Sequence, residues 1–177
     1  MNPEDLDALR VAHTRALAPR VHHLADDHDP HLLHPGRTAL ILLLDLEETD
    51  AVLLAAALLT ETQRGALRAS DGDVLAGLDG HAREVVEAAL SLRATVPDPL
   101  ADDIVEKLVT AGEDTRRVAL AERLDHARHA HVWREGNGDR MLLGQVEGVY
   151  GPVALRTHPM LAKRFESWRL ATVRRLG

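Results

Sequence analysis

The sequence contains no cysteine, few aromatic residues and no long apolar run. Without cysteine, disulfides, thiolate zinc sites and cysteine nucleophiles are excluded. Aromatic residues make up only 2% of the chain and the net charge is −7, which disfavours both base stacking and duplex binding. The longest apolar run, Ala51 to Leu59, is about half a membrane span, and the N-terminus lacks an apolar signal core. We therefore expect a cytoplasmic protein that binds neither nucleic acid nor membranes.

The chain has 177 residues, of which 45% are hydrophobic. This length suits one domain over residues 1–177 with a sizeable core. Because the core must be built from Leu, Ala and Val at helical spacing, helices are favoured over a sheet. The composition and spacing predict an all-α fold: a single compact helical bundle of about eight helices.

Caps, prolines and apolar periodicity place the expected helices along the chain. Asn2 and Asp50 are predicted N-caps, Pro35 suits a first turn, and Gly136 to Asp139 is a strong break. The expected helices cover residues 3–23, 35–46, 51–62, 70–77, 80–93, 104–111, 113–133, 140–150 and 159–175.

Four segments carry motifs in a fixed order. Pro-His-Leu-Leu-His-Pro stands at residues 30–35, and the helix that ends in Ala-Ala-Leu-Leu-Thr-Glu-Thr occupies residues 49–62. Asp-Thr-Arg-Arg-Val-Ala-Leu-Ala-Glu-Arg-Leu-Asp-His-Ala-Arg follows at residues 114–128, and Glu-Gly-Val-Tyr-Gly-Pro-Val-Ala-Leu at residues 147–155. These segments resemble the HD superfamily of metal-dependent phosphohydrolases, closest to the (p)ppGpp hydrolase domain of the RelA/SpoT type and its small stand-alone relatives. The resemblance implies an HD-domain-like helical fold.

The family's site holds a divalent ion with two histidines and two aspartates. By resemblance, the first histidine is kept as His34, and Thr60 stands at the second. Glu61 stands at the aspartate of the His-Asp dyad, and Glu122 at the last aspartate. Two ligand positions therefore keep a carboxylate that is one methylene longer, and one imidazole is missing.

The other family positions also depart from the pattern. The Glu-Asp pair that positions or activates the attacking water falls on Arg64 and Gly65. His126 stands at an asparagine, and His31 at the tyrosine of the first box. The resemblance therefore leaves the chain without an evident general base, a group that typically contributes about 10²–10⁴-fold.

Two readings of the metal position follow. In the first, His34, Glu61, Glu122 and His126 form a repaired site for one divalent ion, manganese, iron or zinc, since His126 lies one helical turn after Glu122. In the second, which we favour, no cofactor is bound. Arg64, three residues after Glu61, then pairs with it and replaces the ion with an internal cation.

More ordinary roles compete with both readings. His34 before Pro35 suits a helix cap, Glu122 suits a buried ion pair with Arg123, and the late-helix His126 suits a solvated face beside the helix dipole. Arginines along residues 116–134 suit solvation of the long helix. The alternative is a phosphate pocket, for which the residues considered are His31, Arg64, Arg123 and Arg128.

The sequence is compatible with three functions. The favoured one is a catalytically impaired relative of the (p)ppGpp hydrolases that binds a phosphorylated nucleotide or a protein partner. The second is an active metal-dependent phosphohydrolase with a modified site. The third is a structural domain without a ligand, and an oligomer is compatible with all three.

Overall fold

The computed structural model describes residues 3–17, 34–59, 80–92, 102–133 and 138–177. Within these ranges the regular structure is entirely helical, which confirms the all-α prediction. The α-helices are α1 (Pro3–Leu17), α2 (His34–Leu40), α3 (Ala51–Leu59), α4 (Gly80–Ser91), α5 (Asp102–Thr110), α6 (Glu113–Trp133), α7 (Gly138–Gln145), α8 (Gly151–Thr157) and α9 (Pro159–Leu176). Two π-helical turns, η2 (Ile41–Asp45) and η3 (Val146–Tyr150), extend α2 and α7.

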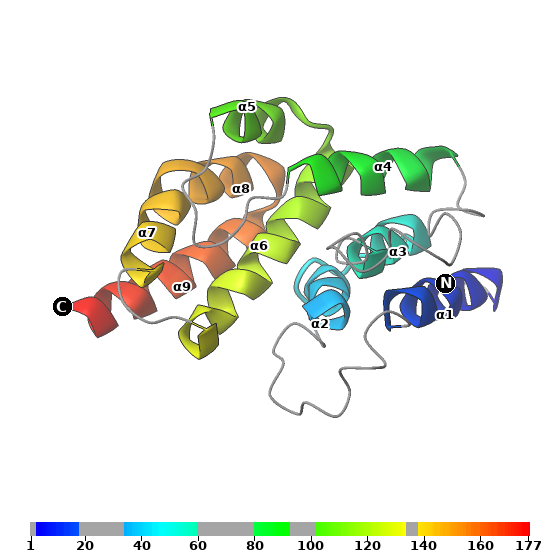
Figure 1. Cartoon of the computed structure of the whole chain (residues 1–177), viewed down its shortest axis with the longest axis horizontal. Coiled ribbons are helices and arrows are strands. Elements are labelled where there is room, and N and C mark those ends of the chain that lie inside the picture. Colours follow the sequence, from blue (N-terminus) through cyan, green and yellow to red (C-terminus); the bar gives the residue numbers. More distant parts are fainter. Residues whose placement is uncertain (1–2, 18–33, 60–79, 93–101, 134–137) are drawn as a thin grey trace.

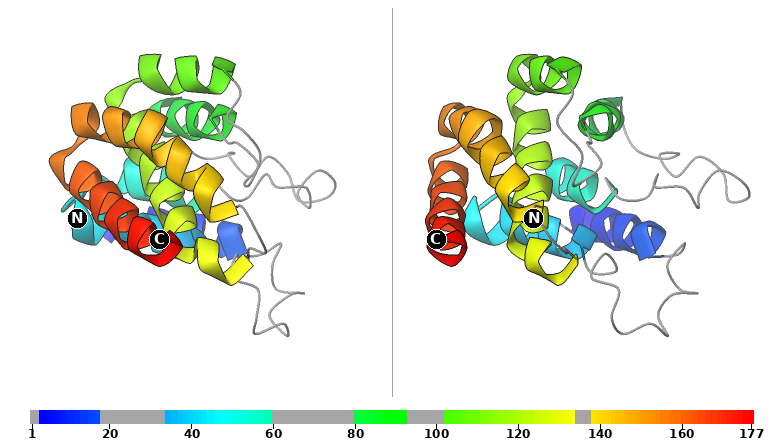
Figure 2. Two further views of the ribbon diagram at one scale, coloured as in Figure 1. Left: turned by 90° about the vertical axis from the view of Figure 1, so that its left-hand side faces the viewer. Right: turned by 60° about the vertical axis from the view of Figure 1, so that its left-hand side comes forward.

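The long helix α6 lies at the centre of the arrangement (Figure 1). Helices α2, α3 and α4 pack against one side of α6, and α7, α8 and α9 pack against the other, as the turned views also show (Figure 2). The Trp168 indole fixes α9 to α6, because its Nε1 donates a hydrogen bond of 2.7 Å to the carbonyl of Ala127. Residues on α6 are therefore in reach of both groups of helices.

Local sequence signals explain where several helices begin. Asp50 caps α3, since its Oδ1 accepts a hydrogen bond of 2.8 Å from the backbone N–H of Val52. Glu113 and Asp114 supply negative charge in the first turn of α6. His158 caps α9 through its side chain, and Pro159 occupies the first turn.

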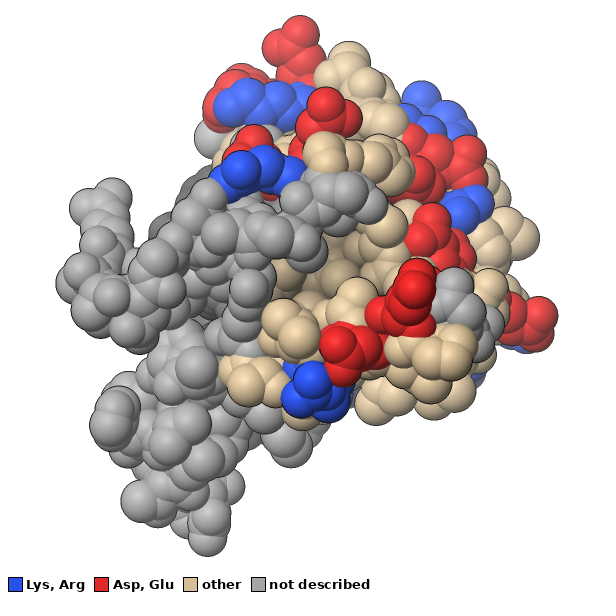
Figure 3. Space-filling model, turned by 90° about the vertical axis from the view of Figure 1, so that its right-hand side faces the viewer, with Lys and Arg blue, Asp and Glu red and all other residues tan. Residues whose placement is uncertain are grey.

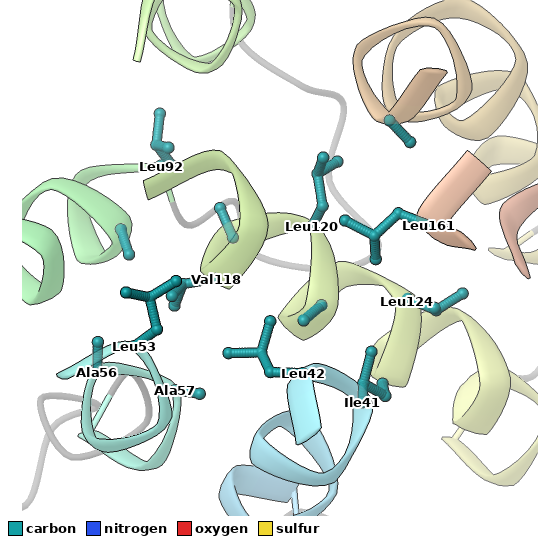
Figure 4. Packing of buried hydrophobic residues seen from close by; sticks show 14 of the residues in the cluster. Ile41, Leu42, Leu53, Ala56, Ala57, Leu92, Val118, Leu120, Leu124 and Leu161 are labelled. Carbon is teal, nitrogen blue, oxygen red and sulfur yellow. The ribbon is translucent and has the colours of Figure 1, made fainter. Parts of the chain in front are cut away.

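The core consists mainly of aliphatic side chains that meet around α6 (Figure 4), and it also holds Tyr150 and Phe165. Leu42 from η2 and Leu53 from α3 approach it from one side, and Leu161 from α9 from the other. On α6, the predicted inward residues are all buried: Val118, Leu120, Ala121 and Leu124. Burial of one such leucine stabilises the folded state by about 1.5–3 kcal/mol. Because these side chains pack against both sides of α6, the core holds the helix from both sides.

Three expectations need correction or fall outside the described ranges. The helix expected over residues 35–46 is present, but its second half is π-helical, with a wider turn than the 3.6-residue pattern indicates. The helix expected over residues 140–150 likewise ends in a π-helical turn, and α8 was not expected. The helix expected over residues 70–77 lies outside the described residues.

Among the helices that the structure describes, none combines the length and apolarity needed to cross a bilayer. On the face shown in Figure 3, the described Lys and Arg residues lie beside Asp and Glu residues. That face therefore presents mixed charge.

Candidate metal centre

Three buried side chains converge between α2 and α6, and we call them the His34–Glu122–His126 cluster. Their candidate ligand atoms all lie within 4.8 Å of one another, and each side chain is at most 3% exposed. Glu122 Oε1 lies 2.9 Å from His126 Nε2 and 3.6 Å from His34 Nε2. The two imidazole rings have centroids 4.1 Å apart. One carboxylate oxygen and two imidazole nitrogens thus face a common point.

The folding of α2 and α6 brings these residues together. His34 is the first residue of α2, and α2 packs directly against α6. Glu122 and His126 are four residues apart in the middle of α6, so that they lie on the same face of that helix. The spacing of Glu122 and His126 was visible in the sequence, but their meeting with His34 depends on tertiary packing.

Asp125 holds His34 from the opposite side of the imidazole ring. Asp125 Oδ2 lies 2.5 Å from His34 Nδ1, and Asp125 also accepts hydrogen bonds of 2.9 Å from Arg37 Nε and 3.0 Å from Arg37 Nη2. Because an ionised carboxylate only accepts hydrogen bonds, Nδ1 carries the proton. In a neutral ring the lone pair is then on Nε2, the nitrogen that faces Glu122.

Arg123 contacts the second oxygen of Glu122. Its Nε lies 2.9 Å from Glu122 Oε2, and both side chains are almost fully buried. The two oxygens of Glu122 therefore have different neighbours: a guanidinium at Oε2 and two imidazoles at Oε1. A cation bound by Glu122 in this conformation would be held by Oε1 alone.

The charges in this region favour an ionised carboxylate and a neutral imidazole. Burial on its own raises the pKa of Glu122, but Arg123 and then His126 outweigh burial and hold that pKa well below its usual value. Burial also raises the pKa of Asp125, and the hydrogen bonds from His34 and Arg37 overcome it, so that this pKa is lowered. Burial lowers the pKa of His126 to about 4, against the attraction of Glu122. Near pH 7, His126 is neutral, and a neutral imidazole has one lone pair for a metal ion, which is on Nε2 when Nδ1 carries the proton.

The donor set fits a divalent transition metal. Two imidazoles and one glutamate are the protein ligands of one common class of zinc site, in which a further position stays open. Ligands about 2.1 Å from one ion in tetrahedral geometry stand roughly 3.4 Å apart, and the contacts here are 2.9 and 3.6 Å. A carboxylate behind a ligating histidine, as Asp125 stands behind His34, is the usual outer partner in such sites.

The structure brings together some of the predicted site residues. His34, Glu122 and His126 meet as the repaired metal site required, while Glu61, Arg64 and His31 lie outside the described residues. The Arg64–Glu61 pair therefore stays a prediction, and the guanidinium that the structure places beside a site carboxylate is that of Arg123.

Two predictions that placed residues of α6 on its solvated surface are wrong. His126 is 1% exposed, so it does not lie on a solvated helix face. Arg123 is 3% exposed and paired with Glu122, so it does not solvate α6. Arg128 is one-third exposed and bonds Asp45 across 2.9 Å.

Sequence reasoning missed Asp125 and Arg37. Asp125 lies next to His126 within the matched helix, and Arg37 lies three residues after His34, one turn along α2. The available signal was that Arg37 is the only arginine in α2, on a helix that packs into the core, where such a residue needs a polar partner. The partner itself could not be identified without the packing of α2 on α6.

Neither a comparison with models of protein families nor a search of curated proteins finds a match to this chain.

Proposed function

We propose that this chain is a divalent-metal protein related to the HD phosphohydrolases, with His34, Glu122 and His126 as the metal ligands. The observation that carries the proposal is the convergence of His34 Nε2, His126 Nε2 and Glu122 Oε1 in a buried cluster. The Asp125 contact supports it, because it orients His34 with Nε2 toward that point. When bound there, a divalent ion would supply Lewis-acid activation for phosphoester hydrolysis.

The residues of the chain divide the remaining work. Asp125 fixes the ring of His34, and Arg37 fixes Asp125 in turn. Arg123 holds Oε2 of Glu122, which leaves Oε1 directed at the two imidazoles. This preorganisation lowers the entropy cost of gathering three side chains around an ion.

A second function is favoured by one observation, the Arg123–Glu122 pair of 2.9 Å. A guanidinium beside the carboxylate already balances one negative charge, as an internal cation does in a site that has lost its metal. Under this alternative the protein is a catalytically impaired relative of the (p)ppGpp hydrolases, which binds a phosphorylated nucleotide without cleaving it.

Metal analysis of the purified protein tests the first proposal. We expect about one manganese, iron or zinc ion per chain, and loss of that ion in His126→Ala. His13→Ala is the matched control, since His13 is exposed on α1, and it should keep the ion. A protein that contains no metal and does not take up added Mn²⁺ or Zn²⁺ contradicts the proposal.

An activity assay separates the two functions. A metal-dependent phosphohydrolase should cleave ppGpp or a simple phosphodiester at a rate that falls with chelator and in His126→Ala. The impaired relative should show no turnover, yet its thermal unfolding temperature should rise with ppGpp in the presence of chelator.

A further inference from the structure

A second polar site lies on the outer side of Asp125, in a cavity of about 210 Å³ that we call the α2–α6 pocket. Its volume is several times the roughly 30 Å³ that one water molecule occupies in the liquid. Helices α2 and α6 lie side by side at this point (Figure 1). The pocket is lined by Arg37, Leu40, Ile41, Leu44, Asp45, Asp125, Arg128 and His129.

The carboxylates of this region are already covered by arginine. Both oxygens of Asp45 are in ion pairs, Oδ2 with Arg128 at 2.9 Å and Oδ1 with Arg164 at 2.5 Å. Asp125 is 2% exposed, and its carboxylate is paired with both Arg37 and His34. Neither carboxylate therefore presents an uncovered negative charge to the cavity.

The charges that line the pocket balance, with Arg37 and Arg128 against Asp45 and Asp125, although the whole chain carries −7. Arg164, which is not part of the lining, adds a third guanidinium through its ion pair with Asp45. Asp45 keeps Arg164 as a partner even if Arg128 turns toward a ligand. Arg128 is 35% exposed and reaches Asp45 through Nη2. A guanidinium of this kind is well suited to a phosphate, because its planar set of N–H groups matches two phosphate oxygens.

One wall of the pocket is apolar and partly open to solvent. Leu44 is 69% exposed and Leu40 is 49% exposed, and both line the cavity together with Ile41. Small-molecule sites typically combine an apolar surface with a few well-placed polar groups. The pocket has both, because its large apolar side chains lie next to an arginine.

We infer that the α2–α6 pocket binds a small phosphate monoester, with the phosphate on Arg128 and an apolar or aromatic part against Leu40 and Leu44. The pocket is distinct from the metal centre, because the His34–Asp125 pair lies between them. The inference deepens the phosphorylated-ligand part of the proposed function but does not depend on a bound metal.

Calorimetric titration of the full-length protein with phenyl phosphate tests the inference. We expect saturable binding that weakens at least tenfold in Arg128→Gln and stays unchanged in Arg174→Gln, an exposed arginine in the last turn of α9. Leu44→Ala should weaken the binding of phenyl phosphate but leave the binding of inorganic phosphate unchanged. Thermal unfolding of each variant shows whether it is folded.

The metal-site variant His126→Ala separates this inference from the metal proposal. Phenyl phosphate should bind His126→Ala as it binds the unmodified protein. If binding is lost in His126→Ala but kept in Arg128→Gln, the phosphate binds at the metal centre and the inference is wrong. Absence of saturable binding, or equal losses in Arg128→Gln and Arg174→Gln, also overturns it.

Discussion

The two sides of Asp125 use similar polar residues in opposite ways. On the inner side, the His34–Glu122–His126 cluster is at most 3% exposed, and its charges have been removed from water. On the outer side, the arginines of the α2–α6 pocket are 23% and 35% exposed and keep much of their hydration. Burial therefore makes the inner residues sensitive to the loss of any partner, while solvent compensates for such losses in the pocket.

The largest expected effect comes from removing the carboxylate of the cluster. Glu122→Ala removes the carboxylate that pairs with the buried Arg123, and breaking a buried pair in this way typically costs about 3–5 kcal/mol. The free energy of unfolding, measured in urea, should fall by that amount. Glu147→Ala, which changes a half-exposed residue, is the control and should cost less than about 1 kcal/mol. Equal effects of the two substitutions would mean that burial does not distinguish these regions.

Metal addition is the next test of the comparison. An ion that binds the folded state alone stabilises it by about 2.7 kcal/mol at 100 times its dissociation constant. Added Zn²⁺ or Mn²⁺ should therefore raise the free energy of unfolding of the unmodified protein and of Arg128→Gln, but not that of His126→Ala. A shift of the same size in His126→Ala would place the ion elsewhere.

Asp125→Asn probes the residue that the two regions share. An amide cannot accept hydrogen bonds from both His34 and Arg37 as the carboxylate does. Loss of such an outer partner typically lowers metal affinity about 10–100-fold. Competition with a chromophoric chelator measures this affinity. Asp103→Asn changes an exposed carboxylate and should leave the metal affinity unchanged, whereas unchanged affinity in Asp125→Asn would remove its positioning role.

The smallest effect is expected in the pocket. Arg128→Gln should change the free energy of unfolding by no more than about 1 kcal/mol, because Arg128 is partly exposed and Asp45 retains Arg164. Arg37→Gln should cost more, about 1–3 kcal/mol, since it removes bonds to the buried Asp125. Urea unfolding of the two variants gives the comparison, and the reverse order would contradict it.

Much of the helical arrangement could be predicted, and the site only in part. The start of α6 at Glu113 was predicted correctly, and so was its inward face, because apolar residues recur there at helical spacing. Glu122 and His126 were predicted as neighbours from their spacing. The contact between His34 and Asp125 joins residues 91 positions apart, so it follows from the packing of α2 on α6 and not from local pattern. The π-helical turns were missed because apolar spacing alone does not reveal one added residue.

The wide turn η2 has a consequence for chain length in this region. A π-helical turn accommodates one more residue than an α-helical turn does. Deleting Leu43 would therefore convert the wide turn to an ordinary α-helical turn, and the residues before and after it would keep their present directions. Adding a further residue to the turn would instead rotate one side by about 100° relative to the other. Asp45 would then turn away, and Arg128 and Arg164 would lose the carboxylate that they share.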